Sequence, residues 1–139
     1  MTILRMQAPA LLRLRISLSG KTVLLAEDNE INQLIVESML ETTKVKLSIV
    51  SNGKEAVAQV TQKQPDLILM DIQMPIMSGE EACEKIKDKY PSIPIVALTA
   101  NVMDHDVKRY YDIGFDGHIA KPMNMHKLYA DSYTHIRAH

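Results

Sequence analysis

The segment from Leu67 to Gly79 reads LILMDIQMPIMSG, and it decides the fold. Its first four residues are apolar and lie between Pro65 and Pro75, which is typical of a strand buried on both faces. Asp71 follows this run directly. In open parallel α/β sheets the carboxyl ends of the strands border the crevice that binds ligands. The segment therefore predicts a binding site at Asp71; the alternative is an aspartate that only ends a strand and starts a turn.

Apolar runs alternate with amphipathic segments along most of the chain. The expected strands are 22–26, 47–50, 66–70, 95–98 and 117–120, and the expected helices are 29–41, 54–63, 80–89, 104–113 and a last one around 125–136. This alternation predicts an α/β fold with a doubly wound, parallel, five-stranded sheet covered by helices on both faces.

The first twenty residues do not share this periodicity and end at Ser19-Gly20. We expect residues 1–20 to be a linker or N-terminal extension and residues 21–139 to form one domain. A short amphipathic helix that docks elsewhere is the alternative for the first segment.

The composition is that of an ordinary globular domain. The 139 residues are 46% hydrophobic and 24% charged, and the net charge is −1. This balance gives no overall attraction to nucleic acid or to a membrane surface, and no stretch approaches the roughly 20 apolar residues of a membrane span. The single cysteine, Cys83, cannot form an intrachain disulfide. We expect a cytoplasmic domain that itself contacts neither nucleic acid nor membrane.

Polar residues end four of the five expected strands: Glu27-Asp28, Asp71, Thr99 and Lys121. With the strand order 2-1-3-4-5, the first and third strands are neighbours and the three carboxylates converge. Each pair of carboxylates repels by roughly 4 kcal/mol at 4 Å for an effective dielectric constant of about 20. Lys121 supplies one counter-charge, and a divalent cation would supply the rest. Oxygen ligands with water in the remaining positions suit Mg²⁺.

Each of these residues also has a purely structural explanation. The run from Glu27 to Asn29 could cap the following helix, because acids and asparagine are favoured there. Thr99 could bond only to backbone, and Lys121 with its following proline could form a solvated turn. The presence of all of them at strand ends favours a shared site.

Four motifs together resemble the receiver domain of two-component response regulators. They are Leu24–Asn32 (LLAEDNEIN), Met70–Gly79 (MDIQMPIMSG), Ala97–Ala100 (ALTA) and Ala120–Pro122 (AKP). The resemblance covers about residues 20–136 and implies a flavodoxin-like (βα)5 fold, whose order 2-1-3-4-5 is that of a known chemotaxis receiver. The first motif and the run Gly114–Ile119 are most similar to receivers of hybrid sensor histidine kinases.

The resemblance implies a His-Asp phosphorelay. Asp71 would be the phosphoacceptor that attacks a phosphohistidine of a histidine kinase or a His-containing phosphotransfer domain, so the domain would catalyse its own phosphorylation and dephosphorylation. Asp28, Asp71 and the backbone carbonyl of Gln73 would bind Mg²⁺ directly. Glu27, which stands where aspartate is commoner, would act through bound water.

The resemblance also implies a conformational switch. Thr99 and the amide of Ala100 would hydrogen-bond the phosphoryl oxygens while Lys121 balances their charge, and the movement of Thr99 would pull the following loop inward. His118 occupies the position at which many members carry Tyr or Phe as a second switch residue, and its imidazole is smaller and ionises near neutral pH. A histidine that only packs is the alternative.

Two other functions use similar residues. A Mg²⁺-dependent aspartyl phosphatase of the haloacid-dehalogenase type needs a second acid two residues after its nucleophile, where this chain has Gln73. A receiver-like interaction module that is never phosphorylated usually lacks one of the acids, the threonine or the lysine. A DNA-binding regulator is disfavoured because no helix-turn-helix segment follows the last expected helix.

Three further expectations concern surfaces and geometry. The segment Lys108–Tyr111 should present the switch to a partner. Part of the apolar surface formed by Ile31, Leu34 and Ile35 should stay exposed for a phosphotransfer partner. The peptide bond between Lys121 and its following proline should be cis. A phosphate shuttle without allosteric output is the alternative to the switch.

Overall fold

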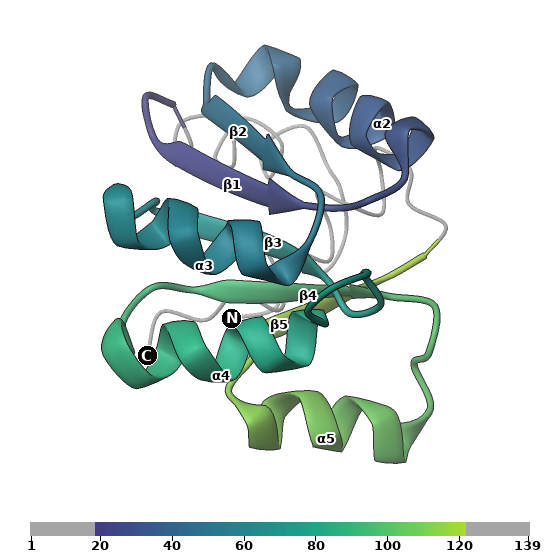
Figure 1. The fold of residues 1–139 in the computed structure, drawn as a ribbon. Coiled ribbons are helices and arrows are strands. Elements are labelled where there is room, and N and C mark those ends of the chain that lie inside the picture. Colours follow the sequence, from purple (N-terminus) through teal and green to yellow (C-terminus); the bar gives the residue numbers. More distant parts are fainter. Residues whose placement is uncertain (1–18, 122–139) are drawn as a thin grey trace.

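The computed structural model describes residues 19–121 (Figure 1). The expected helix at 125–136, the peptide bond after Lys121 and the nature of residues 1–18 lie outside these described residues. Within them, no helix is both long and apolar enough to cross a bilayer.

Five strands and four α-helices alternate along the described chain. In order they are β1 (Thr22–Ala26), α2 (Glu30–Leu40), the short 3-10 helix η1 (Glu41–Thr43), β2 (Lys46–Val50), α3 (Gly53–Gln62), β3 (Leu67–Asp71), α4 (Gly79–Lys89), β4 (Ile95–Thr99), α5 (Asp104–Ile113) and β5 (Gly117–Ala120). All strand pairs are parallel and the order is β2-β1-β3-β4-β5. The predicted fold class and strand order are confirmed, and no end of these expected strands and helices differs from the observed end by more than one residue.

The sheet separates two apolar cores because alternate side chains of each strand point to opposite faces. On one face, Leu24, Ile68 and Ile95 pack against the inner residues of α3, α4 and α5. On the other face, Leu25 and Leu69 pack against α2. Figure 1 shows α3 and α4 side by side across the sheet. Strands β3 and β4 are buried at every residue, as the unbroken apolar runs predict.

Polar caps fix where three of the helices begin. Asn29, Asn52 and Ser78 each accept a hydrogen bond from the backbone N–H three residues later, at 3.0, 2.8 and 3.1 Å. The helices that follow β1, β2 and β3 therefore start immediately beyond the carboxyl ends of those strands. This arrangement places their first turns around the edge of the sheet at which the polar residues gather.

Cys83 lies in α4 and is fully buried. Burial raises the pKa of its thiol to about 12, so the thiol stays protonated near neutral pH and packs as a small apolar group.

Candidate functional site

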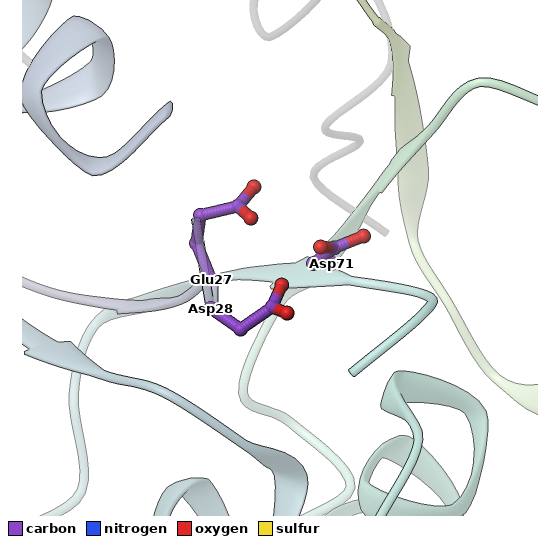
Figure 2. A group of neighbouring side chains, drawn as sticks. All are labelled: Glu27, Asp28 and Asp71. Atoms are coloured by element: carbon purple, nitrogen blue, oxygen red, sulfur yellow. The ribbon is translucent and has the colours of Figure 1, made fainter. Parts of the chain in front are cut away.

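Three carboxylates meet beyond the carboxyl ends of β1 and β3 (Figure 2). Glu27 and Asp28 follow β1, and Asp71 is the last residue of β3; the two strands pair directly, with Ala26 opposite Met70. Each carboxylate offers an oxygen that lies within 4.8 Å of the others. Glu27 is fully buried, Asp71 is only 5% exposed and Asp28 is exposed. The structure therefore brings together the three acids that the sequence placed at this edge.

The hydrogen bonds around Glu27 show that capping does not explain the acid pair. The N-cap of α2 is Asn29, whose side chain accepts from the backbone N–H of Asn32. Glu27 instead accepts from the backbone N–H of Asn29 through Oε2 at 3.1 Å. Its own backbone N–H continues the sheet by donating to Val50 at 3.0 Å. Among the described residues, α2 is therefore capped by Asn29 and not by Glu27 or Asp28.

Hydrogen bonds hold the loop after Asp71 against the end of β3. The backbone N–H of Gln73 donates to Oδ1 of Asp71 at 3.2 Å, and the backbone N–H of Gly79 donates to the carbonyl of Ile72 at 2.9 Å. A Cβ atom on Gly79 would collide with the backbone carbonyl of Asp71, so only glycine fits there. Ile76 has a φ of 70°, which is strained for a β-branched residue. The tight loop fixes the position of the Asp71 carboxylate.

Lys121 is the basic residue that faces the acids in the described part of the chain. Its Nζ lies 3.0 Å from Oε1 of Glu27 and 3.1 Å from Oδ2 of Asp71. Its backbone N–H donates to the carbonyl of Thr99 at 2.8 Å, which continues the sheet past β5. Burial alone would lower the pKa of Lys121, but its contacts with Glu27 and Asp71 outweigh burial and raise that pKa. The lysine therefore stays charged.

One ammonium does not balance three carboxylates. Burial, and then the charge of Glu27, raise the pKa of Asp71 to about 6, against the opposing effect of Lys121. Although Lys121 is close, Oε1 of Glu27 is buried and makes no hydrogen bond of good geometry with any described residue. Its charge partner, Lys121, also contacts Asp71, so one ammonium is divided between two buried carboxylates, which is costly. The donor set consists only of oxygen atoms and leaves room for water, so these residues fit a hard divalent cation.

Thr99, the last residue of β4, is buried and surrounded by hydrogen bonds. Its Oγ1 lies 2.8 Å from the hydroxyl of Tyr110 and accepts from the backbone N–H of Asn101 at 2.9 Å. The Tyr110 hydroxyl also donates to the carbonyl of Asn101 at 3.0 Å. Ala100, which lies between Thr99 and Asn101 in the sequence, is exposed.

The segment Lys108–Tyr111 does not all lie on the surface as expected. Tyr110 is 0% exposed, because it stands on the inner face of α5 and its ring packs edge-to-face on Phe115 at a centroid distance of 6.1 Å. Tyr111 is exposed, and its hydroxyl lies 2.9 Å from Nδ1 of His118. His118 lies in β5, half-buried, with its ring edge-to-face against Tyr111.

Two contacts around the site were not predicted from the sequence. One is the bond between Tyr110 and Thr99, and the other is the ion pair of 2.8 Å between Nε of Arg109 and Oε2 of Glu80, which links α5 to α4. A signal for the first existed: Tyr110 follows Val107 at helical spacing, and a tyrosine that faces a core needs a partner for its hydroxyl. No pattern in the sequence indicated the second.

The apolar residues of α2 divide between core and surface. Val36, Met39 and Leu40 are buried, whereas Ile31 and Leu34, in the first two turns, are 68% and 60% exposed. The expectation of exposed apolar surface on this helix is confirmed.

Comparison with known proteins agrees with this geometry. The family model described as "Response regulator receiver domain" matches residues 23–132. The peroxide stress-activated histidine kinase mak1 of Schizosaccharomyces pombe is 42% identical over 125 residues, which cover 84% of this chain and 8% of that protein. The polar-differentiation response regulator DivK of Brucella anthropi is 36% identical, over 76% of this chain and 87% of DivK. The chain thus spans less than a tenth of mak1 but most of DivK.

Solved structures show the same relationship. The receiver domain of a sensor histidine kinase from Pseudomonas aeruginosa, with a magnesium ion coordinated in its active site cleft, has a TM-score of 0.72 and 33% identity, over 79% of this chain and 92% of that one. The receiver domain of Ssk1 from Saccharomyces cerevisiae, crystallised with the histidine phosphotransfer protein Ypd1, has a TM-score of 0.77 and 32% identity, over 85% and 90% of the two chains. This chain belongs to the response regulator receiver domain family.

Proposed function

We propose that Asp71 accepts a phosphoryl group from a phosphohistidine in a His-Asp phosphorelay, with Mg²⁺ as the cofactor. In this reaction an oxygen of the Asp71 carboxylate attacks phosphorus, the P–N bond of the phosphohistidine breaks, and the imidazole leaves with the electron pair. The observation that carries the proposal is the charge imbalance: the buried Asp71 shares one lysine with Glu27, and a third carboxylate, that of Asp28, lies beside them. Because phosphohistidine is made from ATP, we place the exchange in the cytoplasm.

Four groups would hold Mg²⁺. The carboxylates of Asp28 and Asp71 and the backbone carbonyl of Gln73 would bind it directly, and Glu27 would contact it through water. Bound there, the cation supplies charge neutralisation for the carboxylate nucleophile and for the phosphoryl oxygens. The exposed side chain of Asp28 suits a direct ligand, whereas Glu27 already contacts Lys121 and Asn29.

Lys121, Thr99 and Ala100 would hold the transferred group. The Lys121 ammonium lies 3.1 Å from Asp71 and would balance charge as it spreads over the phosphoryl oxygens. The Thr99 hydroxyl and the Ala100 amide would donate hydrogen bonds to the same oxygens. His118 would act as a second switch residue, since its ring contacts Tyr111 on α5 and joins β5 to that helix.

A phosphotransfer domain or a histidine kinase is the proposed partner. It would dock over α2, where Ile31 and Leu34 are exposed beside the acidic site. The yeast receiver crystallised with Ypd1 supports this class of partner. As most of the similar kinases are far longer than this chain, we also propose that residues 1–20 form a linker or N-terminal extension ahead of a domain at 21–139.

Phosphorylation is tested by incubating the protein with acetyl phosphate and Mg²⁺ and measuring the intact mass. We expect one added phosphoryl group, its loss in Asp71→Asn, and its retention in Asp88→Asn, which changes an exposed aspartate on α4. An unphosphorylated wild-type protein would instead identify a receiver-like interaction module.

Docking is tested with a phosphorylated His-containing phosphotransfer protein as the donor. Ile31→Lys with Leu34→Lys should slow transfer from that protein roughly tenfold, because anchors at the centre of an interface dominate binding. Transfer from acetyl phosphate, which needs no docking surface, is the control and should not change. Equal slowing with both donors would show that the substitutions damage the site rather than the interface.

A further inference from the structure

A buried tyrosine holds the residue that would sense the phosphoryl group. Tyr110 reaches from α5 to the end of β4, where its hydroxyl lies 2.8 Å from Oγ1 of Thr99 and 3.0 Å from the carbonyl of Asn101. The backbone N–H of Asn101 completes the cluster by donating to Thr99 at 2.9 Å. These contacts involve neither the carboxylates nor Lys121.

The protons in this cluster can be assigned by counting donors. A carbonyl can only accept, and each hydroxyl has one proton. If Tyr110 donates to the carbonyl of Asn101, Thr99 donates to Tyr110, and both contacts are short. In the other arrangement Tyr110 donates to Thr99, which must then use a contact of 3.4 Å to the same carbonyl. In both arrangements the hydroxyl proton of Thr99 is donated to an acceptor within the cluster.

Tyr110 cannot easily withdraw. Its ring is 0% exposed and packs on Phe115, and the guanidinium of Arg109 lies 5.3 Å from the ring centroid. Arg109 in turn pairs with Glu80 of α4 at 2.8 Å. Arg109, Glu80 and Asn101 also line the cleft that contains Asp28 and Gln73.

We propose that Tyr110 is a positioning residue that acts as a latch on Thr99: it occupies the hydroxyl proton that a phosphoryl group on Asp71 would take. The latch rests on the proposed function for the role of Thr99. Phosphorylation must break the bond between Thr99 and Tyr110, which leaves the buried phenol with one partner fewer. The latch therefore favours the unphosphorylated state, and α5 receives the signal through Tyr110.

The test removes only the hydroxyl, with Tyr110→Phe, and measures the affinity of the unphosphorylated protein for beryllofluoride with Mg²⁺. We expect roughly two- to tenfold tighter binding, the change that one ordinary net hydrogen bond produces. Tyr90→Phe is the matched control, because Tyr90 follows α4 near the opposite edge of the sheet. In a Thr99→Val background, Tyr110→Phe should have no further effect. Unchanged or weaker binding, or an equal effect in the Thr99→Val background, would overturn the latch.

A second measurement separates the latch from the proposed function. In the protein without any phosphate mimic, NMR scalar couplings report the χ1 rotamer of Thr99. We expect one rotamer in the wild type and averaging in Tyr110→Phe, whereas an unaltered rotamer would overturn the latch. If wild type and Asp71→Asn bind beryllofluoride equally poorly while this averaging is seen, the phosphoacceptor role fails and the hydrogen bond to Thr99 stands.

Discussion

The two edges of the sheet carry similar charged residues, but those at the carboxyl edge lack enough partners of opposite charge and those at the amino edge have them. At the carboxyl edge, Glu27 and Asp71 share Lys121, the Asp28 carboxylate lies beside them, and one oxygen of Glu27 is buried without a hydrogen bond of good geometry among the described residues. Burial and the neighbouring charge of Glu27 raise the pKa of Asp71 to about 6. Burial of these acids therefore destabilises the folded state.

At the amino edge, the charged groups are matched to partners. Lys87 pairs with Asp116 at 2.6 Å and also donates to the carbonyl of Ile93 at 2.7 Å, while Asp116 accepts from the backbone N–H of Ile95 at 2.9 Å. Asp66 accepts from the backbone N–H of Thr22 at 2.8 Å, and this bond lowers its pKa.

The aspartates at the two edges have opposite effects on the stability of the fold. An aspartate whose pKa falls in the folded state stabilises the fold above its ordinary pKa, whereas one whose pKa rises destabilises the fold once it ionises. A charge that the protein itself does not balance is kept where a bound ligand balances it. Acids with perturbed pKa values therefore gather at functional sites. The comparison therefore predicts opposite effects of substitution at the two edges.

The largest expected effect concerns the metal. Asp28→Ala should weaken Mg²⁺ binding by roughly a hundredfold, because it removes a direct ligand, and Glu27→Gln by about tenfold, because it alters a contact through water. Isothermal titration calorimetry measures both affinities. Asp66→Asn at the amino edge should leave the affinity unchanged. A greater loss in Glu27→Gln than in Asp28→Ala would exchange the two roles.

The next effect concerns stability at the amino edge. Lys87→Met should lower the free energy of unfolding by about 2–4 kcal/mol, because it leaves two backbone carbonyls and a half-buried Asp116 without their cation. Urea unfolding measures this change. Lys85→Met, at an exposed position of the same helix, should change it by less than about 0.5 kcal/mol. Equal effects of the two substitutions would remove the contrast between the edges.

A smaller effect concerns pH in the metal-free protein. The folded pKa of Asp71 is about 6 and the ordinary value is 3.8. Between these values the folded state binds more protons at Asp71, so its contribution to stability is greatest below pH 3.8 and is lost as pH rises through about 6. The free energy of unfolding of wild type relative to Asp71→Asn should therefore fall by about 1–3 kcal/mol over this range. A rise would show that Lys121 outweighs burial.

The sequence predicted the sheet well because its strands are continuous apolar runs bounded by turn residues. It also placed Glu27, Asp28, Asp71 and Lys121 together, since parallel strands end at one edge. Tyr110 could not be assigned in the same way. Its burial depends on how α5 packs against β4, and its partner Thr99 is set by side-chain rotamers that no local pattern records.

Uncompensated charge destabilises the carboxyl edge, and a bound cation would relieve this destabilisation. The most direct test is the free energy of unfolding of wild type and Asp71→Asn near pH 7, with a chelator and with saturating Mg²⁺. With the chelator, Asp71→Asn should be the more stable protein, by about 1–3 kcal/mol. With Mg²⁺, wild type should gain stability by mass action and Asp71→Asn much less, so the difference should shrink or reverse. A wild-type protein that is already more stable than Asp71→Asn with the chelator, or an equal gain from Mg²⁺ in both proteins, would show that charge at this edge is not what the cation relieves.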